Sequence, residues 1–145
     1  MLEMADSKHF FMAMEHVPTA TKQEKKVRWT KNSRGTKVPV FYPSEAWSDA
    51  EASLRAHLEQ HKPSKPMCGP VVLDVTWCFP KDGYADGEPY TKKPDTDNLQ
   101  KGLKDVMTEL GWWKDDAQVF SEHATKIHSR ITGIRIDIEE IEEPQ

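Results

Sequence analysis

The most informative stretch of this 145-residue chain runs from Lys92 to Val119, KKPDTDNLQKGLKDVMTELGWWKDDAQV. Asp95 and Asp97 precede an apolar-periodic segment, and the pair Asp115 and Asp116 follows it. Carboxylates beside lysines are suited to holding a hard divalent cation against a phosphate, because Mg²⁺ binds one or two carboxylates together with substrate oxygens. Such a cation can activate water and stabilise the charge that develops on a phosphodiester. The stretch is therefore a candidate metal-dependent site.

A helix separates the two acidic groups. Pro94 biases the residue before it toward extended backbone, so the helix begins after this position. Asp97 suits the N-cap, with Gln100 three residues later as in a capping box. An apolar stripe follows at helical spacing, formed by Leu99, Leu103, Val106 and Leu110. Gly111 supplies a C-terminal stop. The pattern predicts a helix over residues 98–110.

The spacing permits the two acidic groups to meet. A helix of this length carries the chain about 20 Å, at about 1.5 Å per residue. An extended return from Gly111 to Asp116 covers about 20 Å. Asp116 can therefore reach back toward Asp95 and Asp97. Lys101 falls one turn after Asp97 and Asp105 two turns after it, so these three residues are expected near one face of the helix.

Each acidic residue also has a simpler explanation. Asp97 can serve only as a helix cap, and Asp105 can form a solvated pair with Lys101. Asp115 and Asp116 can be loop residues before a strand. Each of these alternatives is the stronger one for a single residue, but together they explain the whole constellation less well than a shared site does.

Two other acidic motifs do not fit. A calcium-binding loop needs Gly at its sixth position and Glu at its twelfth. Counted from Asp95, those positions hold Gln100 and Val106. An aspartyl-phosphate enzyme needs a buried apolar strand before its nucleophile, whereas residues 90–94 read YTKKP.

The run resembles the RusA-type Holliday junction resolvases, whose pattern is Asp-x-Asp-Asn-Leu-x-Lys, an Asp four residues on, a Gly, and Asp-Asp-x-x-Val. The matching residues are Asp95, Asp97, Asn98, Leu99, Lys101, Asp105, Gly111, Asp115, Asp116 and Val119. The resemblance implies that Asp95, Asp97 and Asp116 are catalytic and engage Mg²⁺, for which Mn²⁺ is a candidate substitute. It implies that Lys101 is also required for cutting, and it leaves Asp115 as a further candidate ligand.

The function implied by this resemblance is that of a Mg²⁺-dependent endodeoxyribonuclease that resolves four-way DNA junctions by paired symmetric nicks. Two alternatives remain: a non-catalytic binder of branched DNA that keeps the carboxylates for structure, and a nuclease for another structured nucleic acid. One site per chain and two nicks per junction indicate a two-fold homodimer. The candidate interface elements are the first strand, the last strand, and Trp112 or Trp113.

Basic residues gather near the N-terminal third of a chain whose formal net charge is −4. They are Lys22, Lys25, Lys26, Arg28, Lys31, Arg34 and Lys37, opposed there only by Glu24. We expect this segment to contact DNA, the alternative being a solvated hairpin or loop. The acidic excess lies in the candidate site and in a tail that contains Glu139, Glu140, Glu142 and Glu143.

The whole chain, 1–145, is expected to form a single RusA-like endonuclease domain, with a basic arm or hairpin over about 22–40 and an acidic tail over about 139–145. No apolar run approaches a membrane span and the N-terminus lacks a signal-peptide core, which predicts a cytoplasmic protein without a membrane partner. Cys68 and Cys78 are expected to be free, buried thiols.

The hydrophobic pattern predicts an α+β fold, a small mixed β-sheet with two helices packed on one face. Strands are expected over residues 9–16, 71–79, 118–128 and 133–139. A first helix is expected over residues 44–61, capped by Ser44, with Ala46, Ala50, Leu54 and Leu58 on its apolar stripe. Within the arm, Asn32 to Gly35 form a turn, and Ile134, Ile136 and Ile138 face one side of the last strand.

Two pairs of residues remain to be placed. His57 and His61 have a spacing that can bind zinc, but no third ligand follows, so an exposed helix face is expected. Of Trp112 and Trp113, one is expected in the core. The other is a candidate for a dimer surface or for stacking on an unpaired base.

Overall fold

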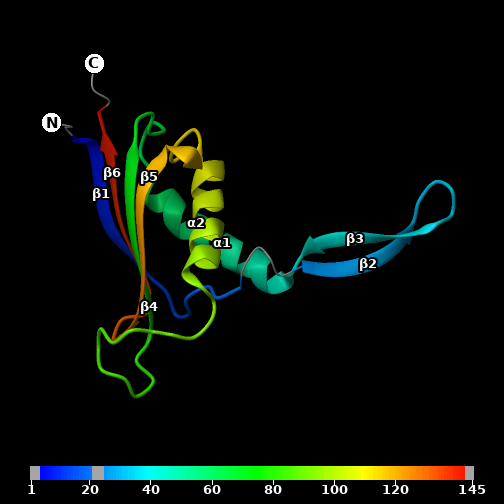
Figure 1. Ribbon diagram of the computed structural model, residues 1–145, viewed down its shortest axis with the longest axis horizontal. Coiled ribbons are helices and arrows are strands. Elements are labelled where there is room, and N and C mark those ends of the chain that lie inside the picture. Colours follow the sequence, from blue (N-terminus) through cyan, green and yellow to red (C-terminus); the bar gives the residue numbers. More distant parts are fainter. Residues whose placement is uncertain (1–3, 21–24, 143–145) are drawn as a thin grey trace.

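The computed structural model describes residues 4–20 and 25–142 and contains two helices, one short 3₁₀ turn and six strands in two sheets (Figure 1). The elements are β1 (Met4–Ala13), β2 (Lys25–Lys31), β3 (Lys37–Pro43), α1 (Glu45–His61), β4 (Val71–Pro80), α2 (Thr96–Leu110), η1 (Asp116–Gln118), β5 (Val119–Ser129) and β6 (Gly133–Ile141). This order of strands and helices confirms the predicted one.

The main sheet has the strand order β1-β6-β4-β5. Strands β4 and β5 are parallel, because α2 crosses over between them, and the other neighbours are antiparallel. Both helices cover the same face of this mixed sheet (Figure 1). The predicted α+β class is confirmed.

The core lies between the sheet and the helices. Ile134, Ile136 and Ile138 are fully buried, as the alternation along β6 predicted. Both Trp112 and Trp113 are buried too, with 0% and 1% of their surface exposed, so the predicted surface role for one of them is wrong. The left-handed turn at Gly111 reverses the chain at the end of α2 and directs both rings inward. The Trp113 Nε1 then donates to Thr108 Oγ1 at 2.7 Å.

Helix α1 begins where the sequence predicted. Ser44 is its N-cap, and its Oγ accepts a hydrogen bond from Trp47 N at 3.0 Å. The buried stripe contains Ala50, Leu54 and Leu58 as expected, but Trp47 takes the place of the exposed Ala46. The large indole extends the buried face by a three-residue step, which the four-residue spacing of alanines and leucines did not reveal.

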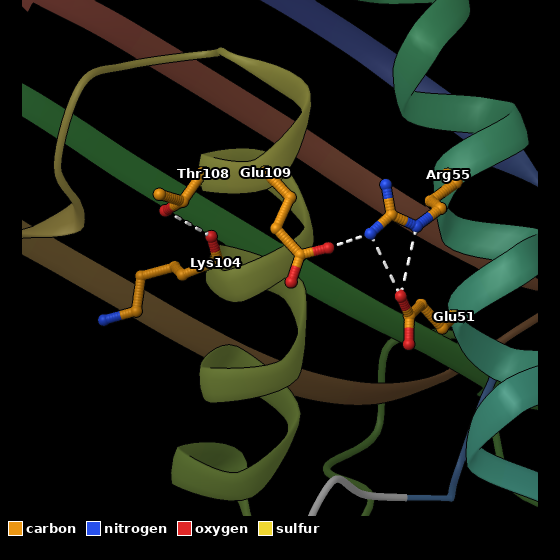
Figure 2. Close-up of polar contacts among 5 residues, drawn as sticks. All are labelled: Glu51, Arg55, Lys104, Thr108 and Glu109. Carbon is orange, nitrogen blue, oxygen red and sulfur yellow. Dashed lines mark hydrogen bonds and ion pairs between the residues drawn. The ribbon is translucent and has the colours of Figure 1, made fainter. Parts of the chain in front are cut away.

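The two helices approach closely at Gly102 of α2. A Cβ at this position would lie 2.9 Å from the Trp47 ring. Nearby, Arg55 of α1 pairs with Glu51 on its own helix and with Glu109 on α2 (Figure 2). Close packing of the two helices therefore explains why α2 contains a glycine, although glycine has a low helix propensity.

The edges of the sheet differ from the predicted bounds. Strand β1 spans Met4–Ala13 where residues 9–16 were expected, because it pairs with β6 as far as Ile141. The predicted acidic tail therefore begins too early, since β6 continues to Ile141. The Glu140 carboxylate accepts hydrogen bonds from the backbone N–H groups of Cys68 and Gly69.

One cysteine and two histidines differ in burial from the prediction. Both cysteines are free, but Cys68 is exposed and only Cys78 is buried, where burial raises the pKa of its thiol. Both His57 and His61 are half-buried, where an exposed face was expected, and the His61 ring stacks on Phe10 with a centroid separation of 4.2 Å.

Neither helix of the described chain is long and apolar enough to cross a membrane.

The basic segment forms the two-stranded hairpin β2-β3, which projects away from the sheet and helices (Figure 1). Its turn lies at residues 32–35 as predicted. Asn32 Oδ1 accepts hydrogen bonds from the N–H groups of Arg34 and Thr36, and Gly35 has a positive φ of 78°. Lys22 and Glu24 lie outside the described residues.

Candidate active site

Helix α2 begins at Thr96, two residues before the predicted start, so Asp95 occupies the N-cap position and Asp97 lies in the first turn. The predicted cap at Asp97 is therefore wrong. Pro94 limits only the residue before it, and Asp95 is itself a favoured N-cap residue type. The Asp95 side chain makes no capping hydrogen bond. Because Asp97 is already helical, the expectation that two extended aspartates point to one side does not apply.

An open pocket of about 370 Å³ lies between α2, η1 and β5. Its lining residues are Thr96, Asp97, Gln100, Lys101, Lys104, Asp116, Glu122 and Ala124. Three of the four predicted catalytic residues, Asp97, Lys101 and Asp116, therefore lie around one hollow. Asp95 is exposed at the entrance to α2 and is not part of the lining.

Glu122 of β5 is a pocket carboxylate that the sequence analysis missed. Its Oε1 accepts a hydrogen bond from Lys104 Nζ at 2.9 Å, and its Oε2 accepts one from Gln100 Nε2 at 2.7 Å. Gln100 in turn accepts a hydrogen bond from the indole Nε1 of the buried Trp77. Gln100 thus serves the pocket wall, where the sequence predicted a capping box. In Figure 2, Lys104 extends from α2 on the side away from α1.

Strand β5 also holds the segment that leads into α2. Lys126 Nζ donates to the backbone carbonyls of Lys92 at 2.6 Å and Pro94 at 2.8 Å. The N–H of Tyr90 donates to the Lys126 carbonyl at 3.0 Å. These contacts fix the approach to Asp95 and Asp97 against the sheet, and no local sequence signal announced this role for Lys126.

The two neighbouring aspartates after α2 have different environments. The Asp115 carboxylate caps η1 by accepting a hydrogen bond from Ala117 N at 2.9 Å. Gln118 completes the capping box, and its Nε2 donates to the carbonyls of Met67 and Gly69. Asp116, by contrast, lines the pocket. Asp115 therefore has a structural role as a cap, and its role as a further metal ligand stays a prediction.

The predicted convergence of Asp95, Asp97 and Asp116 stays a prediction. Over residues 4–20 and 25–142, no three His, Cys, Asp or Glu side chains are gathered closely enough to hold a metal ion. Asp97 belongs to the first turn of α2, whereas Asp116 follows its far end. A metal held here by one or two of these carboxylates would take its remaining oxygen ligands from water or a phosphate.

The donor set nevertheless fits a hard divalent cation. Asp97, Asp116 and Glu122 offer only carboxylate oxygens, and the pocket is open to solvent water. Mg²⁺ usually keeps several waters and uses one or two protein carboxylates. Lys104 is engaged with Glu122, whereas Lys101 is exposed on the same wall. The arrangement can hold a phosphate between a cation and an ammonium group.

The six described basic residues of the predicted DNA-binding set are all exposed on the hairpin or its turn. They are Lys25, Lys26, Arg28, Lys31, Arg34 and Lys37. A smaller hollow at the hairpin base joins Lys25 and Phe41 to Trp47 of α1 and to Asp105 and Glu109 of α2. The hairpin is thereby connected to the helix that carries Asp97 and Lys101.

Comparison with known proteins gives two kinds of match. The family model described as Endodeoxyribonuclease RusA matches residues 15–139. The chain is 30% identical over 135 residues to the crossover junction endodeoxyribonuclease rusA of Lactococcus phage r1t, a match covering 91% of this chain and 97% of that protein. It is 31% identical over 94 residues to the uncharacterized protein YqaN of Bacillus subtilis strain 168, covering 57% of this chain and 66% of that protein.

Proposed function

Because the chain belongs to the RusA family of endodeoxyribonucleases, and so to the DNA endonucleases, we propose that it resolves four-way DNA junctions in a Mg²⁺-dependent reaction. The observation that carries this proposal is the pocket between α2, η1 and β5, which is lined by Asp97, Lys101 and Asp116. Those residues come from both halves of the motif that defines the resemblance. A protein that only bound DNA would have no need for carboxylates that repel phosphate.

In this proposal the carboxylates of Asp95, Asp97 and Asp116 would hold the metal. The cation, when bound, lowers the pKa of a water ligand and neutralises charge on the phosphate. Asp97 and Asp116, which line the wall of the pocket, would place such a cation beside a phosphate bound there. Lys101 contacts a non-bridging oxygen of the scissile phosphate and stabilises the negative charge that grows there. Mn²⁺ is a candidate replacement for Mg²⁺ because it also accepts oxygen ligands.

The basic hairpin supplies the electrostatic attraction in this account. Its Lys and Arg side chains contact the phosphate backbone, which guides the protein to DNA without reading sequence. The pocket itself holds three carboxylates against two lysines, so it attracts DNA weakly before the metal binds. Binding and cutting are therefore assigned to different parts of the chain.

A homodimer completes the proposal. The described part of each chain offers one pocket that contains Asp97, Lys101 and Asp116, and two symmetric nicks need two such pockets related by a two-fold axis. Strand β1 is a free edge of the main sheet and remains a candidate interface. Strand β6 lies between β1 and β4, so only its outer face is available for an interface. The buried Trp112 and Trp113 no longer qualify.

The experiment that tests this function is cleavage of a synthetic four-way junction, with linear duplex and a flap as controls, in Mg²⁺, in Mn²⁺ and in a chelator. We expect paired nicks at symmetric positions of the junction only when the metal is present. Binding without cutting under every metal condition would favour the non-catalytic binder. Stronger cutting of the flap than of the junction would favour a nuclease for another structured substrate.

A further inference from the structure

The projecting hairpin carries large apolar side chains that the protein leaves in water. Trp29 is 65% exposed, Phe41 is 67% exposed and Val27 is 48% exposed. In the register of the hairpin, Val27 pairs with Phe41 and Trp29 pairs with Pro39. Because side chains alternate across a strand, these four residues share one face. They form an exposed apolar strip, which we call the aromatic strip.

The opposite face of the hairpin is different. It carries Arg28 and Thr30 on β2, paired with Val40 and Val38 on β3. Both valines are half-buried, whereas Pro39 and Phe41 are exposed. The face that carries the valines also carries Tyr42, which is paired with Lys26 and is 40% exposed. The face of the aromatic strip therefore holds the two most exposed aromatic side chains of the hairpin, Trp29 and Phe41.

Cross-strand packing explains only part of the aromatic strip. Trp29 and Phe41 are diagonal neighbours, and such pairs stabilise a hairpin by about 0.2–1 kcal/mol. Two-thirds of each residue's surface nevertheless stays in contact with water. Exposed aromatic surface of this kind, when contiguous, marks a binding surface.

The charges around the aromatic strip indicate the chemistry of the partner. The pair Lys31 and Lys37 flanks it toward the turn, and Lys25 flanks it toward the base. Residues 25–43 contain six Lys and Arg side chains and no Asp or Glu. At the base, Phe41 and Lys25 also adjoin carboxylates of the two helices, Glu51, Asp105 and Glu109. Along the hairpin itself the aromatic rings lie between cations, as on surfaces that bind nucleic acid strands, where bases stack on rings and phosphates contact lysines.

We propose that Trp29 and Phe41 stack on bases that are unstacked at the branch point of junction DNA, while the flanking lysines hold the adjoining phosphates. The inference rests on the proposed function, because it takes branched DNA as the substrate. It adds a surface that would distinguish junctions from linear duplex, because the bases of a linear duplex stay stacked and cannot stack on the rings. The hairpin base adjoins α2, the helix that also carries Asp97.

The test compares two double variants with matched strand propensity. Trp29→Val with Phe41→Val keeps β-branched residues in the strands but removes both π-faces. Trp29→Phe with Phe41→Tyr keeps both rings. Ile131→Ala removes a 58% exposed apolar side chain outside the hairpin and serves as the control. Binding to a four-way junction and to a linear duplex is measured in a chelator, so that cutting does not contribute.

We expect the valine variant to lose about tenfold or more in junction affinity, since stacking contributes about 1–3 kcal/mol per base. Its affinity for linear duplex should change by less than about twofold, since the phosphate contacts that dominate duplex binding remain in place. The aromatic variant and Ile131→Ala should bind both DNAs as the unmodified protein does. Circular dichroism melting confirms that the variants are folded.

Equal losses on junction and duplex, or no loss on either, would overturn the inference. A valine variant that becomes monomeric by light scattering, while the unmodified protein is dimeric, would assign the strip to contact between two copies of the chain. These outcomes are separate from failure of the proposed function, which would show as junction binding by the unmodified protein without metal-dependent cutting.

Discussion

At the scale of the residue, some charged side chains of the pocket support its wall and others are available for chemistry. Lys104 and Gln100 hold Glu122, and Asp115 caps a turn. Asp97, Asp116 and Lys101 line the same hollow. We therefore regard the Glu122 contacts as the support of the pocket wall, and we assign the reacting groups to the motif residues.

The role of Lys101 gives the first prediction. Lys101→Ala should lower the single-turnover cleavage rate by about tenfold or more, because removing one group that stabilises transition-state charge has effects of this size or larger. The melting temperature should change little, since Lys101 is exposed. Lys65→Ala, which removes an exposed lysine from the linker before β4, is the control.

The alternative for Lys101 is a helix-surface pair with Asp105, which would contribute only a few tenths of a kcal/mol. Under that alternative, Lys101→Ala would cut at the normal rate per folded molecule. A normal rate, with or without a lower melting temperature, would therefore contradict the catalytic assignment.

The sequence indicated three residues of the pocket but not Glu122, for a physical reason. Asp97, Lys101 and Asp116 were predictable because a helix of known rise fixes their separation along the chain. Glu122 was not, because one glutamate in an alternating strand looks like any solvent-facing residue. It enters the pocket only because β5 lies parallel to β4 at the sheet edge nearest α2.

At the scale of the element, strands with strong alternation and helices with clear stripes were predicted almost to the residue. The start of α2 was not, because Asp95 and Asp97 are equally good N-cap residues and only tertiary contacts choose between them. In the structure the Leu99 N–H donates to the Asp95 carbonyl at 3.1 Å, so the helix begins after Asp95. Lys126 holds the segment that leads into it through the carbonyls of Lys92 and Pro94. Strand order also depends on long-range pairing that no local pattern encodes.

Gly102 gives a prediction about helix packing. Gly102→Ala should lower the melting temperature, although alanine favours a helix by about 1 kcal/mol over glycine. The new methyl group would lie 2.9 Å from the Trp47 ring, and overpacking a well-filled core costs about 1–3 kcal/mol. Thermal unfolding followed by circular dichroism measures the change.

The control for this prediction is a double-mutant cycle. In a Trp47→Leu background the ring is absent, so Gly102→Ala should be neutral or stabilising. If Gly102→Ala stabilises the unmodified protein as well, α1 and α2 do not approach as closely as described.

The hairpin gives a prediction about electrostatics. Changing Lys25, Lys26 and Arg28 to Gln should weaken binding to all DNA, because we propose that these exposed cations contact phosphates. Each lost contact should reduce the slope of log affinity against log salt by about 0.9. A salt titration of duplex binding measures it. The control is the triple variant of Lys62, Lys65 and Lys81 to Gln, which removes the same charge outside the hairpin. An unchanged slope for the hairpin variant would show that DNA contacts lie elsewhere.

At the scale of the whole molecule, two symmetric nicks in one junction require two pockets. We predict that light scattering at micromolar concentration gives about twice the 16.7 kDa mass of the chain, because a two-fold dimer can match the symmetry of a junction. Repeating the measurement with junction DNA separates a stable dimer from one that DNA assembles. A protein that stays monomeric in both conditions and still makes paired nicks would contradict the prediction.

We propose that the carboxylates of the α2 motif are needed for cutting and not for binding. The most direct measurement is single-turnover cleavage of a four-way junction in Mg²⁺ by the variants Asp95→Asn, Asp97→Asn and Asp116→Asn, with binding measured in parallel. Asp115→Asn is the matched control, because its carboxylate has a capping role. We predict that each of the three variants loses cleavage while binding the junction at least as tightly, since each removes a negative charge near phosphate. Cleavage at a near-normal rate by Asp97→Asn or Asp116→Asn would contradict the account.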